Sequence, residues 1–318
     1  MIDVVALGEL LIDFACLSAD AEGYPTMAAH PGGAPANFLA ALSKFGAKTA
    51  LLGKVGADAF GKLLTVTLQK AGIETKGLVA ADEVFTTLAF VTFDEHGDRE
   101  FSFSRKPGAD TCLTFEELDL SLIDEAKVFH FGTLSLTDEP ARTATQKAVA
   151  YAKSRGKLIT YDPNLRKPLW KDLEEAKAQL LWGLKQADVV KISDEEVEFL
   201  FGLGVEAGAK HILDAYGVKL VFVTCGADGC FFKNAKAQGH VPSLNGIKVI
   251  DTTGAGDIFG GSAVWKLLQL DKAPEALNEA ELREIVTFAC TSAGLSTTRP
   301  GGISSVPEYA EVLGRMEG

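Results

Sequence analysis

Short apolar runs alternate with amphipathic segments along most of the chain. In the amphipathic segments the apolar residues recur every three or four positions, which is typical of helices packed on one side. Buried strands that alternate with such helices predict an α/β fold, in which a mostly parallel sheet is covered by helices on both faces. The predicted strands are 4–9, 49–56, 128–132, 157–163, 189–193 and 220–226, and the clearest predicted helices are 141–156, 171–186 and 205–217.

A different pattern occupies residues 84–105. Two strand-like runs flank the turn-like sequence EHGD (95–98), and the alternating Phe101 and Phe103 indicate an antiparallel hairpin with one covered face. Residues 14–30 are also strand-like, although glycine and proline interrupt them. These segments predict a small sheet beside the main one, which would serve as a lid over a crevice at the strand ends.

The charge and cysteine content narrow the classes of function. Acidic residues outnumber basic ones by 43 to 31, for a formal net charge of −12, which argues against binding to nucleic acid or to an anionic membrane. The five cysteines form no metal-binding spacing, and their odd number favours reduced thiols in the cytoplasm. The apolar start carries Asp3, Glu9 and Asp13, so it predicts neither a signal peptide nor a membrane span.

The sequence DTTGAGD (251–257) is the strongest candidate for chemistry. Gly254, Ala255 and Gly256 stand just before a predicted helix, where backbone N–H groups at a helix N-terminus can hold an anion. Asp257 in the first turn would repel that anion unless the carboxylate acts as a base. The pattern therefore indicates phosphoryl transfer to a hydroxyl group. The structural alternative is a glycine turn followed by an acid that complements the helix dipole.

Other polar residues follow predicted strands, so they would share the carboxyl edge of the sheet with this loop. Asp13 follows a predicted strand and suits the binding of vicinal hydroxyls. Asn37 lies in the first turns of the helix that follows Gly32 and Gly33, where an amide suits sugar recognition. Arg166, in a loop stiffened by two prolines, can grip polyol or phosphate oxygens. Each of them also has a plain reading as a turn, cap or surface residue.

Two further loops could either bind a nucleotide or play a purely structural role. In KISDEE (191–196), helix capping explains the acids, while one of them could instead order water around Mg²⁺. VTCGADG (223–229) contains a TxGxxG pattern that can border a nucleotide, and a hairpin turn explains it at least as well.

Taken in order, these motifs are more specific than any one of them. PGGAPAN (31–37), DPNLR (162–166), the TxGxxG loop and DTTGAGD resemble the signatures of the ribokinase-like sugar kinases, the PfkB carbohydrate kinase family, over essentially the whole chain. The segments that look most like fructokinases are GELLIDF (8–14), REFSFSRKPGAD (99–110), DPNLRKPLW (162–170) and KISDEE. The 99–110 segment also overlaps the pattern of 2-keto-3-deoxygluconate kinases, which remains the close rival.

The resemblance implies a single ribokinase-like domain over residues 1–318, with a Rossmann-like core and a lid from about 14–30 and 84–108. It implies ATP-dependent phosphorylation of a primary hydroxyl, with D-fructose giving fructose 6-phosphate. It implies catalysis by Asp257, with the backbone of Gly254, Ala255 and Gly256 as an anion hole. The implied sugar-binding residues are Asp13, Gly32, Gly33, Asn37, Phe103, Arg105 and Arg166, and the implied nucleotide-binding residues are Lys191, Ser193, Thr224, Gly226, Gly229 and Gly256.

The resemblance also implies two kinds of metal ion. Glu196 would bind Mg²⁺ through water, and a monovalent-cation loop, usually filled by K⁺, would use Asp251, Thr253, Ser296, Gly301 and Ser305. Ser193 and Cys290 depart from the family, which commonly has asparagine at both positions, and Cys290 leaves the adenine contacts undefined. A homodimer through the lid is plausible for this family. Outside the enzymes, a catalytically silent nucleotide- or sugar-binding regulator and a scaffold with purely structural glycines stay open.

Overall fold

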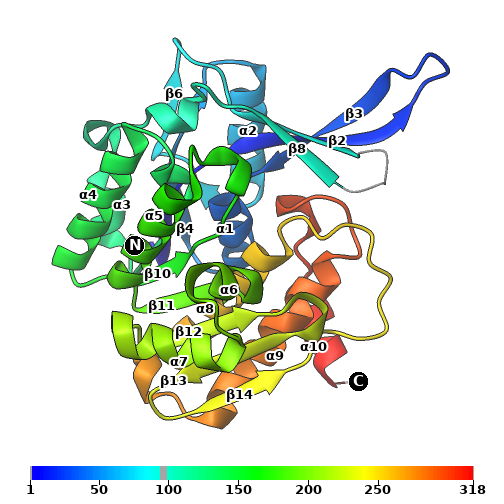
Figure 1. Cartoon of the computed structure of the whole chain (residues 1–318). Coiled ribbons are helices and arrows are strands. Elements are labelled where there is room, and N and C mark those ends of the chain that lie inside the picture. Colours follow the sequence, from blue (N-terminus) through cyan, green and yellow to red (C-terminus); the bar gives the residue numbers. More distant parts are fainter. Residues whose placement is uncertain (1, 94–98, 318) are drawn as a thin grey trace.

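The computed structural model describes residues 2–93 and 99–317 (Figure 1). The predicted EHGD turn at 95–98 lies outside the described residues. Two sheets organise the described part of the chain, a large one sandwiched between helices and a small one at its edge (Figure 1).

The large sheet has the order β14-β13-β12-β11-β10-β9-β1-β4-β5, with β6 also paired to β4. All its pairs are parallel except β12–β13 and β13–β14, which form an antiparallel edge. Its strands are β1 (Val4–Leu7), β4 (Thr49–Gly56), β5 (Ile73–Glu74), β6 (Leu78–Ala81), β9 (Val128–Gly132), β10 (Leu158–Asp162), β11 (Val189–Ser193), β12 (Leu220–Thr224), β13 (Cys230–Asn234) and β14 (Gln238–Val241).

Helices cover both faces of this sheet because its strands are apolar on both sides. In β1, Val5 and Leu7 pack toward one layer, while Val4 and Ala6 pack toward the other. The first layer holds α3 (Leu120–Glu125), α4 (Ala141–Ser154), α5 (Leu173–Gln186), α6 (Asp194–Phe201) and α7 (Val205–Tyr216). The second holds α1 (Ala34–Lys44), α2 (Ala59–Lys70), α8 (Ala255–Leu270), α9 (Glu279–Ser296) and α10 (Tyr309–Glu317).

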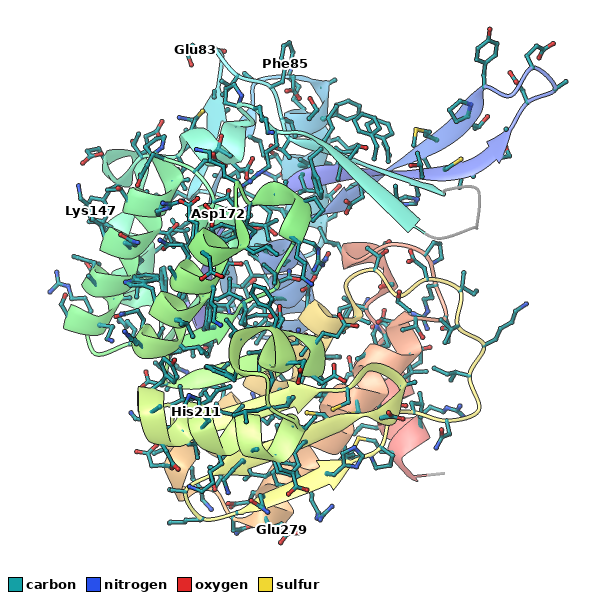
Figure 2. All side chains as sticks on the ribbon, viewed as in Figure 1. Glu83, Phe85, Lys147, Asp172, His211 and Glu279 are labelled. Atoms are coloured by element: carbon teal, nitrogen blue, oxygen red, sulfur yellow. The ribbon has the colours of Figure 1, made fainter. Side chains whose placement is uncertain are left out.

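Short 3₁₀ helices connect several of these elements. Their bounds are η1 (Ala109–Cys112), η2 (Phe115–Glu117), η3 (Leu134–Leu136), η4 (Lys167–Leu169), η5 (Gly226–Asp228), η6 (Pro274–Ala276) and η7 (Ile303–Ser305). Side chains fill the space between the sheet and both helix layers (Figure 2).

The small sheet has the order β3-β2-β7-β8, with strands β2 (Leu11–Ala19), β3 (Pro25–Gly32), β7 (Leu88–Phe93) and β8 (Arg99–Ser104). β2–β3 and β7–β8 are antiparallel pairs, and β2–β7 is parallel. The β2–β3 hairpin extends away from the body of the molecule, at the upper right of Figure 1. The β2 strand begins soon after β1 ends, so the chain passes directly from the large sheet into the small one.

The structure confirms the predicted fold class, a mostly parallel sheet with helices on both faces and a second, small sheet. Each strand predicted for the large sheet and each of the three clearest predicted helices is present in the structure. The VTCGADG sequence connects the antiparallel strands β12 and β13. The hairpin turn considered for this motif therefore forms.

Candidate functional site

A pocket of about 380 Å³ opens at the carboxyl edge of the large sheet, where the small sheet meets it. It brings together the end of β1, the start of β2, the loop after β10 and the N-termini of α1 and α8. Its lining residues are Glu9, Leu11, Asp13, Gly33, Ala34, Asn37, Phe103, Leu134, Asn164, Arg166, Thr252, Thr253, Gly254 and Asp257.

The N-terminus of α8 enters this pocket with a glycine turn. Gly254 caps the helix in the left-handed conformation (φ 75°), which glycine adopts without strain. The Ala255 N–H donates to the Thr252 carbonyl at 3.2 Å, so it is already engaged within the chain. Among the described residues no acceptor pairs with the N–H groups of Gly254, Gly256 and Asp257. Those three amides, rather than the Gly-Ala-Gly set expected, are therefore available to an anion.

Asp257 is held in the first turn of α8 by a side chain from far away in the sequence. The Asn37 Nδ2 donates to Asp257 Oδ2 at 2.9 Å, which fixes one carboxylate oxygen and leaves the other for a ligand. Burial raises the pKa of Asp257, while the hydrogen bond from Asn37 and the charges of Lys191 and Arg166 lower it. A partly desolvated carboxylate in a pocket has the properties of a general base.

Asn37 is itself tightly enclosed. Its side chain is only 4% exposed, and its Oδ1 has no partner among the described residues. A Cβ placed on Gly302 would lie 2.1 Å from that oxygen, so only glycine fits there. The loop of Gly302 therefore packs directly on the residue that orients Asp257.

Asp13 and Arg166 face each other from the small sheet and from the loop after β10. Burial raises the pKa of Asp13 to about 6; Arg166 opposes that shift, and Asp257 and Asp251 add to it. Gly32 lies behind Asp13, because a Cβ there would be 2.2 Å from Oδ2. Gly33 caps α1 with φ 118°, where a Cβ would be 2.5 Å from the Glu9 carbonyl. The two glycines thus allow this close approach.

The expected nucleotide-side residues lie along the same carboxyl edge, outside the lining of this pocket. Lys191 on β11 is partly buried, and its Nζ lies 3.0 Å from Asp162 Oδ2 and 3.0 Å from where a Gly256 Cβ would be. The hairpin after β12 contains Thr224 together with Gly226 (φ 53°) and Gly229 (φ 98°). This arrangement puts a cation directly beneath the glycine turn of α8.

Ser193 and Glu196 form a capping box at the start of α6. Glu196 Oε2 accepts the Ser193 N–H at 2.8 Å, and the Ser193 hydroxyl accepts the Glu196 N–H at 3.2 Å. The other oxygen, Oε1, accepts the Leu165 N–H at 2.7 Å. Glu196 therefore ties the loop that carries Arg166 to helix α6, and each carboxylate oxygen retains a lone pair for water.

Three of the residues expected for a monovalent cation, Asp251, Thr253 and Gly301, are linked by hydrogen bonds. Asp251 Oδ1 accepts from the Thr253 N–H and hydroxyl at 3.0 and 2.7 Å, and Oδ2 accepts the Gly301 N–H at 2.9 Å. Ser305 is fully buried and Ser296 is nearly so. Carboxylate, hydroxyl and carbonyl oxygens are the hard donors that such a cation prefers.

One expected sugar-binding residue lies elsewhere, and one lining residue was not expected. Arg105 does not line the pocket: it is 4% exposed, and Asp110, Thr137 and the Leu134 carbonyl occupy its guanidinium. Glu9, which lies within GELLIDF but was given no role in the sequence analysis, also lines the pocket, and burial raises its pKa to about 7. The sequence signal for Glu9 was its position within an apolar run. Burying an unpaired carboxylate there is costly, so such an acid indicates a binding or structural role.

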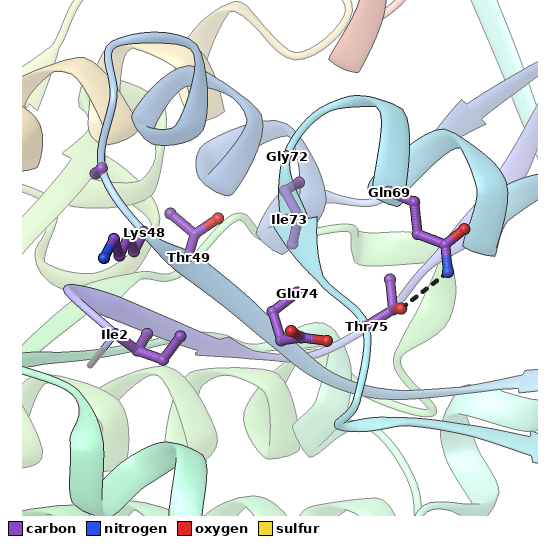
Figure 3. Close-up of a pocket in the computed structure, with 9 residues that line it drawn as sticks. Ile2, Lys48, Thr49, Gln69, Gly72, Ile73, Glu74 and Thr75 are labelled. Carbon is purple, nitrogen blue, oxygen red and sulfur yellow. Dashed lines mark hydrogen bonds between the residues drawn. The ribbon is translucent and has the colours of Figure 1, made fainter.

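A second pocket, of about 430 Å³, lies at the opposite, amino-terminal edge of the large sheet (Figure 3). Thr49 and Ile73 begin the neighbouring strands β4 and β5 around it, and Ile2 lies just before β1. Its charged residues, Lys48 and Glu74, are exposed. It holds none of the converging carboxylates and helix N-termini of the smaller pocket, so it is not the candidate site.

Within residues 2–93 and 99–317, no group of three or more His, Cys, Asp or Glu side chains is arranged to hold a metal ion. None of the described helices combines the length and apolar content that crossing a membrane requires.

Comparison with known proteins gives one consistent result. Residues 1–309 match the family profile described as pfkB family carbohydrate kinase. The chain is 41% identical over 321 residues to fructokinase-2 of Solanum lycopersicum, covering 99% of this chain and 96% of that one. Its structure is similar to a Xylella fastidiosa fructokinase with bound ATP (30% identity, TM-score 0.91, 99% and 98% coverage). It is also similar to a Vibrio cholerae O395 fructokinase double mutant with fructose, ADP and potassium ion bound (31% identity, TM-score 0.86, 98% and 98% coverage).

Proposed function

This chain belongs to the pfkB family of carbohydrate kinases, and we propose that it is an ATP-dependent fructokinase that converts D-fructose and ATP to fructose 6-phosphate and ADP. The observation that carries the proposal is the pairing of Asp257 with the open N–H groups of the α8 N-terminus in one pocket. A base and an anion-binding site at one place suit transfer of a phosphoryl group to a hydroxyl.

In the proposed reaction the sugar binds between the small sheet and the carboxyl edge of the large one. Asp13, Asn37 and Arg166 line that space and offer donors and acceptors for hydroxyl groups. The free Asp257 oxygen accepts the proton as the sugar hydroxyl attacks the γ-phosphorus of ATP, and the bond to ADP breaks. The N–H groups of Gly254 and Gly256 stabilise the charge on the transferring phosphoryl oxygens.

The small sheet is proposed to act as a lid. The expected lid segments, about 14–30 and 84–108, overlap the described strands β2, β3, β7 and β8, and Phe103 on β8 lines the pocket opposite the core. Covering the sugar would exclude water that could otherwise take the phosphoryl group. One ribokinase-like domain over residues 1–318, carrying this lid, is the organisation that we infer.

The remaining polar residues near the carboxyl edge of the large sheet suit a nucleotide and its metal ions. We propose that the nucleotide binds beside Lys191, Ser193, Thr224, Gly226 and Gly229, which lie along the same edge of the sheet. Glu196 would hold a water ligand of Mg²⁺. When bound, Mg²⁺ neutralises charge on the β- and γ-phosphates. The oxygen set of Asp251, Thr253, Ser296, Gly301 and Ser305 suits K⁺, which would add a fixed positive charge beside the α8 turn.

A phosphorylation panel tests the proposal. Purified protein is assayed for ADP release with fructose, 2-keto-3-deoxygluconate, ribose and adenosine, with and without K⁺. Fructose should have the highest kcat/KM, and K⁺ should raise turnover. Preference for the sugar acid would make the protein a 2-keto-3-deoxygluconate kinase. ATP binding without any turnover would make it a silent regulator, and no ligand-induced stabilisation would favour a scaffold.

A homodimer in the cytoplasm completes the proposal. Among the described strands, β3 and β8 are the edges of the small sheet, and Leu17 and Tyr24 on its β2–β3 hairpin are 65% and 70% exposed. Edges and apolar side chains of this kind suit pairing with a second copy. Light scattering on the wild type and on Leu17→Lys would test the dimer. The five cysteines, all unpaired, suit a reducing compartment.

A further inference from the structure

Arg105 links the end of the small sheet to the core through several hydrogen bonds and a buried ion pair. It follows the last residue of β8 and is almost fully buried. Its Nε and Nη2 reach Asp110 Oδ2 at 2.8 and 2.7 Å, in a pair whose side chains are 2% and 3% exposed. Its Nη1 donates to Thr137 Oγ1 at 2.7 Å, and Nη2 donates to the Leu134 carbonyl at 2.8 Å. Its Nη1 also lies 3.9 Å from Oδ2 of a second acid, Asp138, whose side chain is 37% exposed.

Further contacts hold the Asp110 side chain in place beside Arg105. Its second oxygen, Oδ1, accepts the hydroxyl of Thr87 at the start of the small sheet. A Cβ placed on Gly108 would lie 1.8 Å from Thr87 Oγ1 and 3.0 Å from Asp110 Oδ1, so glycine is needed for the turn. Breaking one member of a buried ion pair leaves the other charge uncompensated, so this arrangement fixes Arg105 as one half of a neutral pair.

The pair lies immediately behind the sugar end of the pocket. The Leu134 residue whose carbonyl accepts from Arg105 lines the pocket, and so does Glu9, which senses the charges of both Asp110 and Arg105. The ionisable groups of the lining are Glu9, Asp13 and Asp257 against Arg166 alone. With Arg105 neutralised, acidic groups dominate the electrostatic environment of this end of the pocket.

We propose that Asp110 determines substrate specificity: by neutralising Arg105 inside the protein, it makes the pocket accept neutral sugars and reject sugars that carry a carboxylate. The proposal rests on the proposed function, because it concerns the same sugar site. An arginine without its acid would attract a carboxylate, whereas acidic neighbours repel one. Arg105 and Arg166 therefore do not act as the basic pair that a sugar acid would need.

Replacing Asp110 by Asn tests this directly. Asn keeps the shape and one acceptor oxygen for Arg105, but it removes the negative charge. We measure kcat/KM of wild type and Asp110→Asn for fructose and for 2-keto-3-deoxygluconate. The ratio of sugar acid to fructose should rise about tenfold or more in the variant. Asp110→Glu, which keeps the charge, should retain discrimination near that of wild type.

Two controls isolate the charge of Arg105. Asp188→Asn removes an acid paired with Lys219 at 3.0 Å, beside the amino ends of β11 and β12, and should leave the ratio unchanged. The double variant Asp110→Asn/Arg105→Gln should lose the gain of the single variant. A ratio in Asp110→Asn equal to that of Asp188→Asn, or a gain that survives in the double variant, overturns the proposal.

The outcome is separable from that of the fructokinase proposal. The wild-type panel decides whether fructose is phosphorylated; if no sugar turns over, calorimetric affinities for the two sugars give the same ratio. If Asp110→Asn does not fold, the wild type is titrated with salt from about 0.01 M to about 0.15 M, which shortens the Debye length from about 30 Å to about 8 Å. Screening should then strengthen binding of the sugar acid while fructose is unaffected. Affinity for the acid that stays constant or falls with salt overturns the proposal.

Discussion

Replacing Asp257 by Asn separates catalysis from binding at this site. The amide has the same size, but it cannot take the proton of an attacking hydroxyl. General-base catalysis is worth about two to four decades of rate, which corresponds to about 2.7–5.4 kcal/mol of activation free energy. The anion-binding groups are backbone N–H donors, so they are unaffected by the change. We therefore expect kcat to fall by that factor while the affinity for ATP stays close to wild type.

The same substitution should not destabilise the protein. Burial raises the pKa of Asp257 above its usual value of 3.8, so the folded state holds the proton more tightly than the unfolded chain. The ionised group then lowers stability as pH rises from 3.8 through the folded pKa, and that penalty persists at neutral pH. Asp257→Asn removes it, so its melting temperature at pH 8 should equal or exceed that of wild type.

The assay couples ADP release to a spectrophotometric readout at saturating sugar and ATP, with calorimetry for ATP binding. Asp271→Asn is the matched control, since it makes the same change on an exposed residue at the other end of α8. It should keep full activity, because Asn tolerates the left-handed conformation there (φ 47°). Wild-type turnover by Asp257→Asn would refute the assignment of the base, and loss of ATP binding would refute the separation of roles.

Three further predictions follow from named contacts. Arg166→Ala should raise KM for the sugar about tenfold or more with little change in KM for ATP, because the exposed guanidinium faces Asp13 and Asp257; unchanged sugar kinetics would remove it from the site. Gly302→Ala should lower kcat by up to about 100-fold, because its Cβ displaces Asn37 from Asp257, while Gly314→Ala, which meets nothing within 4 Å, should be silent. Burial lowers the pKa of His130 from 6.5 to about 3, so the folded state excludes the proton and stability present above pH 6.5 should be lost as pH falls toward 3. Urea unfolding of His130→Gln should show a shallower loss in that window, and an identical slope would contradict this cause.

The layered fold was predictable because its cause is local and repeated. Each parallel strand is buried on both faces, so it reads as a continuous apolar run, and each covering helix needs one apolar stripe. Runs such as 128–132 and 189–193 became β9 and β11 for this reason. The antiparallel β13–β14 edge was not predicted, since its short strands lack that signal.

The sequence by itself also determined which chemistry is present. The glycine turn at Gly254, followed within one helical turn by Asp257, indicated a helix start with an acid in it, and the order of the motifs indicated the family. These features depend on neighbours within a few residues, where backbone conformation is set by the residue types themselves. They gave no means of deciding whether a polar side chain faces a ligand or another part of the protein.

Only the tertiary structure decided the partners of the charged residues. Asn37 orients Asp257 across 220 positions of sequence, and Glu196 holds the backbone of the Arg166 loop. The family resemblance placed Arg105 among the sugar-binding residues, but in the structure it forms a buried ion pair with Asp110. The physical reason is that electrostatic and hydrogen-bonding energies depend on distance and burial in space, and chain folding brings together groups whose separation along the sequence carries no such information.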